Sequence, residues 1–109
     1  VMNMLPVNEI FSFANMIEFK EGSFAKKVAV DDGQTKVFVV SIDHGVLPEH
    51  EAPLNAIVYA LEGSAVITCE GREYPIHAGE SFTFKKGQLH SVASDNKYKM
   101  VLFLTADQL

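Results

Sequence analysis

Short stretches of alternating apolar and polar residues follow one another along this chain, and glycines separate them. From residue 55 onward these stretches read NAIVYALE, SAVITCE, REYPI and ESFTFK, and they break at Gly63, Gly71, Gly79 and Gly87. Runs that are rich in β-branched and aromatic residues and end at turn-forming residues are typical of β-strands. The pattern predicts an all-β fold, an antiparallel β-barrel or two-sheet jelly roll with almost no helix.

Three more strands are predicted, over residues 23–30, 35–42 and 98–105. The first ends at an Asp-Asp-Gly sequence, which commonly joins antiparallel strands. The second should stop at Asp43-His44-Gly45, which has the composition of a turn. Residues 1–17 mix apolar and polar positions without a sustained period, so they predict no more than a short turn or helix.

The length and composition of the chain fit one domain. With 109 residues, of which 48% are hydrophobic, the chain can bury one core. We expect a single domain over residues 1–109, with a barrel core over residues 23–105 and an N-terminal segment over residues 1–22. That segment is more apolar than a free tail, so we expect it to contact a second copy of the chain in a homodimer. Its apolar residues are Met4, Leu5, Val7, Ile10, Phe11 and Phe13.

Charge, hydropathy and cysteine content exclude several classes of function. The formal net charge is −5 and the basic residues do not gather into one stretch, so nucleic-acid binding is not expected. No apolar run approaches the ~20 residues of a membrane helix, so membrane contact is not expected either. The first residues lack the pattern of a signal peptide and Cys69 has no partner for an internal disulfide, which favours a cytoplasmic location.

Two stretches carry the candidate chemistry. The first, GVLPEHEAPLNAIVYALEG, runs from Gly45 to Gly63 and contains His50; the second, GESFTFKKGQLH, runs from Gly79 to His90. In their order and spacing, these glycines and histidines resemble the paired motifs of the cupin superfamily, whose members are small jelly-roll β-barrels. The resemblance implies a double-stranded β-helix in which His50 and His90 lie on neighbouring strands and point into one cavity.

The departures from the cupin motifs concern the metal ligands. Ala52 and Ala56 stand where the first motif has its second histidine and its glutamate, and the proline and asparagine of the second motif are also absent. Of the usual metal ligands, the resemblance leaves His50 and His90, which are our candidate ligands for a weakly bound divalent transition metal. A zinc or non-haem iron site normally takes three or more protein ligands.

Charged residues near the two motifs are the next candidates. Strand side chains alternate between faces, so Glu49 and Glu51 should point away from the side of His50 unless the turn at Pro48 or Pro53 reorients them. Lys85 and Lys86 precede the second histidine. They form either a solvated loop or a cationic rim that favours anionic ligands.

Two classes of function stay open. Two alanines in place of a histidine and a glutamate enlarge and dry the site, which favours an apolar small-molecule pocket. Its predicted ligand-binding residues are His50, His90, Ala52, Ala56 and Phe84. The protein is then a small-molecule-binding cupin barrel. The alternative is a metal-dependent cupin enzyme, a dioxygenase or isomerase, with an incomplete two-histidine metal site, and the fold alone does not decide between the two.

Overall fold

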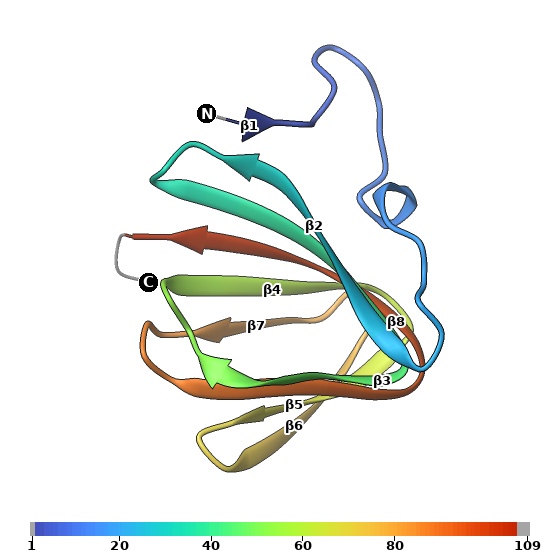
Figure 1. Cartoon of the computed structure of the whole chain (residues 1–109), viewed down its shortest axis with the longest axis vertical. Helices are drawn as coiled ribbons and strands as arrows, with labels where there is room; N and C mark the ends of the chain where they lie inside the picture. The colour runs from blue at the N-terminus through green and yellow to red at the C-terminus, as the bar shows by residue number, and fades with distance from the viewer. Residues whose placement is uncertain (1, 107–109) are drawn as a thin grey trace.

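The computed structural model describes residues 2–106, and nearly all of its regular structure is β (Figure 1). Its first elements are β1 (Met2–Asn3), the short 3-10 helix η1 (Ala14–Met16), β2 (Ser23–Asp31) and β3 (Thr35–Glu51). They are followed by β4 (Asn55–Glu62), β5 (Ser64–Cys69), β6 (Arg72–His77), β7 (Ser81–Phe84) and β8 (Leu89–Thr105).

The pairings between these strands are antiparallel. The strand order is β1-β2-β3-β8-β4-β7, while β5 pairs with the first part of β8 and β6 pairs with β5. In Figure 1, the two long strands β3 and β8 run side by side through both layers of the molecule. The predicted antiparallel all-β fold is confirmed. Because the sheet does not close into a ring, a jelly roll describes it better than a closed barrel.

Two strands are longer than the sequence predicted. β3 does not stop at residues 43–45, and β8 begins at Leu89 rather than at residue 98. His44 has a φ of 50°, and the β3–β8 register shifts between Asp43 and Gly45. Such an irregularity bends a strand while the pairing continues on both sides of it. Residues with the composition of a turn therefore lie inside a strand here.

The N-terminal segment covers part of the outer face of the sheet. Leu5 and Phe13 pack against a buried cluster that includes Val39 of β3. The predicted short helix is the single turn η1, and Lys99 fixes it, because its Nζ donates a hydrogen bond of 2.6 Å to the carbonyl oxygen of Ala14. Part of the apolar character that predicted a dimer contact is thus used inside one chain.

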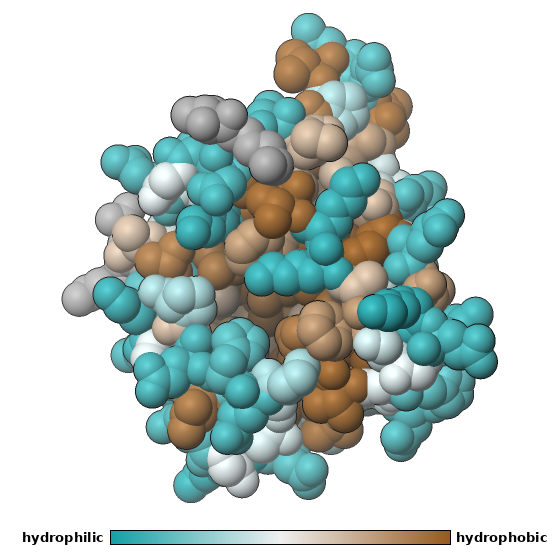
Figure 2. All heavy atoms as spheres, viewed as in Figure 1, coloured by the Kyte–Doolittle hydropathy of each residue, from teal (hydrophilic) through white to brown (hydrophobic). Residues whose placement is uncertain are grey.

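The inner faces of the two layers enclose the main core. Its largest fully buried side chains include Tyr98, Phe84, Ile42, Ile67 and Met100. Figure 2 shows hydrophobic residues gathered in a hollow near the centre of one face, with hydrophilic residues around it. Within residues 2–106, no helix is long and apolar enough to cross a membrane.

An apolar surface patch lies uncovered on the outer face. It consists of Phe11, Ile57 and Tyr59, whose exposed fractions are 40%, 36% and 41%. The ring of Phe11 packs edge-on against Phe13 at 5.1 Å, and Phe13 packs edge-on against Phe103 at 6.1 Å. Phe103 lies directly opposite Ile57 in the β4–β8 ladder. The patch therefore extends without a break from the N-terminal segment to β4, and we call it the β4 patch.

Tyr98 offers a test of the core. Its hydroxyl group is buried without a hydrogen-bond partner among the described residues, and burial raises the pKa of Tyr98. We expect Tyr98→Phe to be at least as stable as the wild type at neutral pH, and more stable by up to about 1 kcal/mol, because it removes an unsatisfied buried group. Urea denaturation measures this difference.

The raised pKa of Tyr98 also has a consequence at alkaline pH. Above pH of about 10 the unfolded chain loses the tyrosine proton while folded Tyr98 keeps it, so wild-type stability should fall as the pH rises. Tyr98→Phe should lose less stability than the wild type over the same pH range. Tyr74→Phe, at an exposed position outside the β4 patch, is the control and should behave as the wild type. Equal alkaline losses in Tyr98→Phe and the wild type would contradict this account.

We propose that a second copy of the chain covers the β4 patch in a homodimer. Light scattering at micromolar concentration should give twice the monomer mass for the wild type. The Ile57→Lys/Tyr59→Lys double variant should give the monomer mass, because charged side chains are depleted from interface cores. Val46→Lys, at a 51% exposed position outside the patch, is the control and should stay dimeric. A monomeric wild type refutes the proposal.

Candidate functional site

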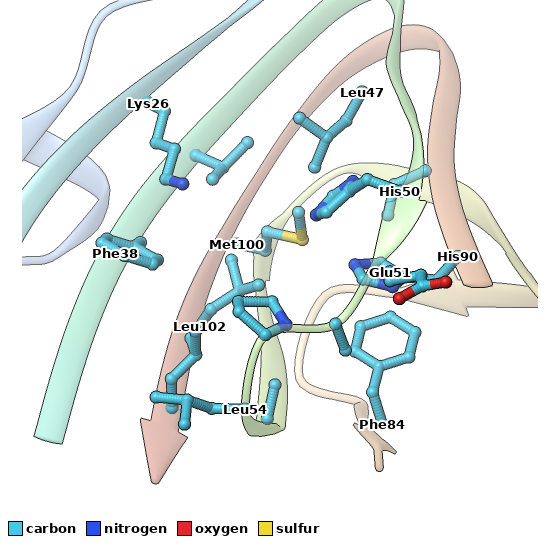
Figure 3. A pocket seen from close by; sticks show the side chains of 16 residues that line it. Lys26, Phe38, Leu47, His50, Glu51, Leu54, Phe84, His90, Met100 and Leu102 are labelled. Carbon is cyan, nitrogen blue, oxygen red and sulfur yellow. The ribbon is translucent and has the colours of Figure 1, made fainter. Parts of the chain in front are cut away.

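The β3–β8 ladder places the two motif histidines against each other. His50 of β3 lies directly opposite His90 of β8, and their ring centroids are 4.3 Å apart. The ring of Phe84, on β7, lies 4.1 Å from the ring of His90 at an interplanar angle of 31°. Figure 3 shows the three rings together on one side of a cavity. Side chains that are distant in sequence therefore form one aromatic cluster.

Each histidine is held by a backbone carbonyl two residues before it. The Nδ1 of His50 donates a hydrogen bond of 2.9 Å to the carbonyl oxygen of Pro48, and the Nδ1 of His90 donates one of 3.2 Å to that of Gln88. A carbonyl oxygen can only accept, so the proton of each neutral ring lies on Nδ1. Nε2 is then the ring nitrogen that can accept a hydrogen bond from a ligand or bind a cation.

Burial distinguishes the two rings. His90 is only 4% exposed, whereas His50 is exposed at the mouth of the site. Burial lowers the pKa of His90, the nearby His50 lowers it further, and the hydrogen bond to Gln88 opposes both. His90 is consequently neutral at physiological pH, with the Nε2 lone pair available.

A cavity of about 200 Å³ opens next to the histidine pair. It is lined by all of the residues predicted to bind a ligand: His50, His90, Ala52, Ala56 and Phe84. Aliphatic side chains form most of the remaining wall: Val40, Leu47, Leu54, Val92, Met100, Leu102 and Leu104. The cavity is thus largely apolar, with a few polar groups at defined points, which is the usual composition of a small-molecule site. A binding role for these residues stays a prediction.

Glu51 is a lining residue, which is the alternative that the sequence left open for a strand interrupted near Pro48 or Pro53. Strict alternation should turn it away from His50, yet it lines the same cavity. The β3–β8 register shift lies between Leu47 and His50, before both residues, so it moves His50 and Glu51 together. Glu51 is instead the last residue of β3, where the regular alternation of the strand ends. Figure 3 shows Glu51 on the same side of the cavity as both histidines. The adjacent prolines were the only sequence signal for this irregularity.

Lys26 is a lining residue that the sequence analysis missed. It lies directly opposite Val40 in the β2–β3 ladder, and both side chains line the cavity. The next residue, Lys27, lies opposite Val39 and so points to the outer face. Alternation required one of these adjacent lysines to face inward, although the sequence did not indicate which one. Lys85 and Lys86, which we considered as a cationic rim, are exposed and are not among the lining residues.

Two further histidines lie away from the cavity. His44 pairs with Asp43 at 2.7 Å, and His77 pairs with Glu80 at 3.1 Å. The side chains of both histidines are more than half exposed. Both are surface residues with local carboxylate partners, which suits them as controls for the cavity histidines.

The sequence model of the family described as "Cupin domain" matches residues 36–105, which include both histidines and both long strands. This chain belongs to the cupin family. No curated protein sequence matches it. The cupin fold is also found in the solved structures that resemble this chain.

Three solved structures illustrate the range of cupins with this architecture. A cupin superfamily protein from Desulfitobacterium hafniense is 19% identical, with a TM-score of 0.87 over 98% of this chain and 99% of that one. A cupin 2 conserved barrel domain protein from Leptotrichia buccalis is 27% identical, with a TM-score of 0.82 over 87% of this chain and 47% of that one. The DMSP lyase DddQ from Ruegeria pomeroyi is 22% identical, with a TM-score of 0.70 over 77% of this chain and 47% of that one. Structures that resemble this chain thus include an enzyme as well as cupins that are described by their fold alone.

The residues around the histidine pair do not complete a cupin metal cage. Among residues 2–106, no group of three or more His, Cys, Asp or Glu side chains is placed to hold a metal ion. Ala52 and Ala56 are buried on the cavity wall, where the family motif has a histidine and a glutamate. Two imidazoles alone fall short of the usual three or four protein ligands. The site does not fit a tightly held metal.

Restoring one ligand tests this interpretation. The backbone of Ala52 is fixed beside His90, because its N–H donates to Gln88 at 3.0 Å and its carbonyl accepts from Gly87 at 2.8 Å. We expect Ala52→His to bind Co²⁺ at least about tenfold more tightly than the wild type, since a third imidazole completes a common ligand set. The visible absorption of bound Co²⁺ measures the affinity.

The control for this experiment is the Ala52→His/His50→Ala double variant. It returns the site to two imidazoles and should lose the gain in affinity. If Ala52→His binds Co²⁺ no more tightly than the wild type, residue 52 does not stand in the coordination position that the cupin motif implies.

Proposed function

We propose that this cupin binds a small organic molecule in the cavity, and that His50 and His90 recognise the molecule through their Nε2 atoms. The observation that carries the proposal is a pair of orientated imidazoles at the wall of an otherwise apolar cavity. A cavity of about 200 Å³ lies below the ~300–1,000 Å³ of pockets for drug-sized ligands, so the molecule is small.

The chemistry of the walls supports recognition rather than metal-dependent catalysis. Both Nδ1 atoms are engaged by backbone carbonyls, which fixes the rings before a ligand arrives. A pre-organised acceptor in an apolar cavity binds a donor group more strongly than it does in water. Ligand hydroxyl, amide or protonated carboxyl groups have the required donor.

A metal-dependent cupin enzyme, a dioxygenase or isomerase, is the second candidate. The two available Nε2 atoms favour it, since imidazole is a common transition-metal ligand. Metal analysis of protein purified without an affinity tag separates the two candidates. About one equivalent of a transition metal per chain, retained through dialysis, favours the enzyme, and its loss on dialysis favours the metal-independent binding protein.

Thermal-shift screening tests the proposed binding role. We expect members of a library of small carboxylates, amides, alcohols and sugars to raise the melting temperature of the wild type. The same compounds should not raise that of the His50→Ala/His90→Ala double variant, because the groups that orientate the ligand are gone. Each shift is compared with the melting temperature of the same variant alone, since removal of buried His90 should itself cost about 1–3 kcal/mol.

The matched control is the His44→Ala/His77→Ala double variant, which removes two exposed histidines outside the cavity. It should keep the wild-type shifts. Compounds that stabilise the cavity double variant as much as the wild type would contradict a binding role for His50 and His90.

A further inference from the structure

Lys26 brings a positive charge to the wall of an apolar cavity. It lies on β2, opposite Val40, and its side chain crosses toward Phe38, with Nζ 4.0 Å from the centroid of that ring. Figure 3 shows Lys26 and Phe38 on the side of the cavity away from His50 and His90. The cavity therefore has an ammonium group at one end and two imidazoles at the other.

The ammonium group has no carboxylate partner in the described part of the chain. None of its ion pairs within 4 Å involves Lys26. Burial lowers the pKa of Lys26, and the nearby Lys36 lowers it further. Lys26 remains exposed as a residue, so water solvates its ammonium group in part and the face of Phe38 covers another part. A ligand that carries a negative charge would supply the missing partner.

Glu51 disfavours a second negative charge on the ligand at the histidine end of the cavity. Glu51 is an exposed lining residue whose carboxylate lies beside His90 in Figure 3, so a second negative charge on the ligand would meet an anion at that end. One ammonium group with a single charge also matches one carboxylate better than a phosphate, which usually takes several donors. Between these ends the wall is aliphatic and aromatic.

We propose that the ligand of this cavity is a small organic monoanion, a monocarboxylate with a compact apolar body, whose carboxylate binds Lys26. The inference rests on the proposed function, because it names the class of molecule that the cavity holds. The apolar body packs between Phe38, Met100 and Leu102, and the end remote from the carboxylate lies toward the histidines.

An inward-pointing lysine on an exposed strand has a competing structural explanation. β2 pairs with β1 only at residues 30 and 31, so the edge of β2 near Lys26 is open among the described residues. Inward-pointing charges on edge strands hinder edge-to-edge association. If this explanation holds, Lys26 prevents association through the edge of β2 and does not contribute to ligand affinity. The association state of Lys26→Met is therefore a second readout of the experiment.

Matched pairs of probes isolate the negative charge. 4-Hydroxybutyrate and 4-hydroxybutyramide have the same body, as do 4-hydroxybenzoate and 4-hydroxybenzamide, and only the first of each pair is an anion. In all four, the hydroxyl group remote from the carboxylate or amide is the donor that His50 and His90 require. Their affinities are measured by calorimetry and by shifts of the His50 and His90 ring resonances. Three proteins are compared: the wild type, Lys26→Met, and the control Lys27→Met, which changes the adjacent lysine on the outer face.

We expect the wild type and Lys27→Met to bind each carboxylate about three- to tenfold more tightly than its amide, as a charge-assisted hydrogen bond to a partly exposed ammonium group predicts. Lys26→Met should lose that preference and bind the amides as the wild type does. Both substitutions keep a long apolar stem, so packing changes little.

The other outcomes overturn the inference in distinguishable ways. If amides bind the wild type as tightly as carboxylates, the cavity binds small molecules but does not select them by charge. The inference about a monocarboxylate then fails, and the proposed function is kept. If Lys26→Met keeps the preference for carboxylates but associates into larger particles, Lys26 protects the edge of β2. If no probe shifts the histidine resonances, both the proposed function and this inference fail.

Discussion

The antiparallel ladder between β3 and β8 is the interaction on which the rest of this structure depends. It runs from Thr35 opposite Thr105 to Glu51 opposite Leu89. β2 and β4 pair with one part of these strands and β5 pairs with the other, so the same two strands hold both layers. The bend between the layers needs close backbone contact, because a Cβ at Gly45 would lie 2.8 Å from the carbonyl oxygen of Ser23. Only glycine fits there without a shift of β2.

The site is a direct product of this ladder. His50 and His90 are cross-strand partners, so the contact between their rings follows from the register of β3 against β8. The shift between Leu47 and His50 sets this register, so a change there would move His50 away from His90. Glu51 lines the cavity as the last residue of β3, where the strand gives way to the connection with β4.

The sequence allowed the strands and the histidine pair to be predicted, because both depend on local patterns. Glycine-bounded runs marked β4 to β7, and two motifs indicated His50 and His90. The continuation of β3 through residues 43–45 was not predictable, since a turn and a bulge share the same residue preferences. The inward direction of Lys26 was missed, because alternation gives the face of a side chain only when the register is known. That of Glu51 stayed open, because the effect of the neighbouring prolines on the strand could not be predicted.

Ala52 and Ala56 affect both metal binding and ligand binding in the cavity. Small apolar side chains on the wall remove two potential metal ligands and at the same time lower the polarity of the cavity. Lys26 and Glu51 are then the charged side chains that line the cavity, and both are exposed at its edge. Fixed side-chain charges, from Lys26 at one end and Glu51 at the other, then take the place of a metal ion as the source of electrostatic selectivity on our proposal. A cupin that gives up its metal ligands in this way keeps the fold's ability to orientate a small molecule, since that ability lies in the β3–β8 ladder and not in the metal.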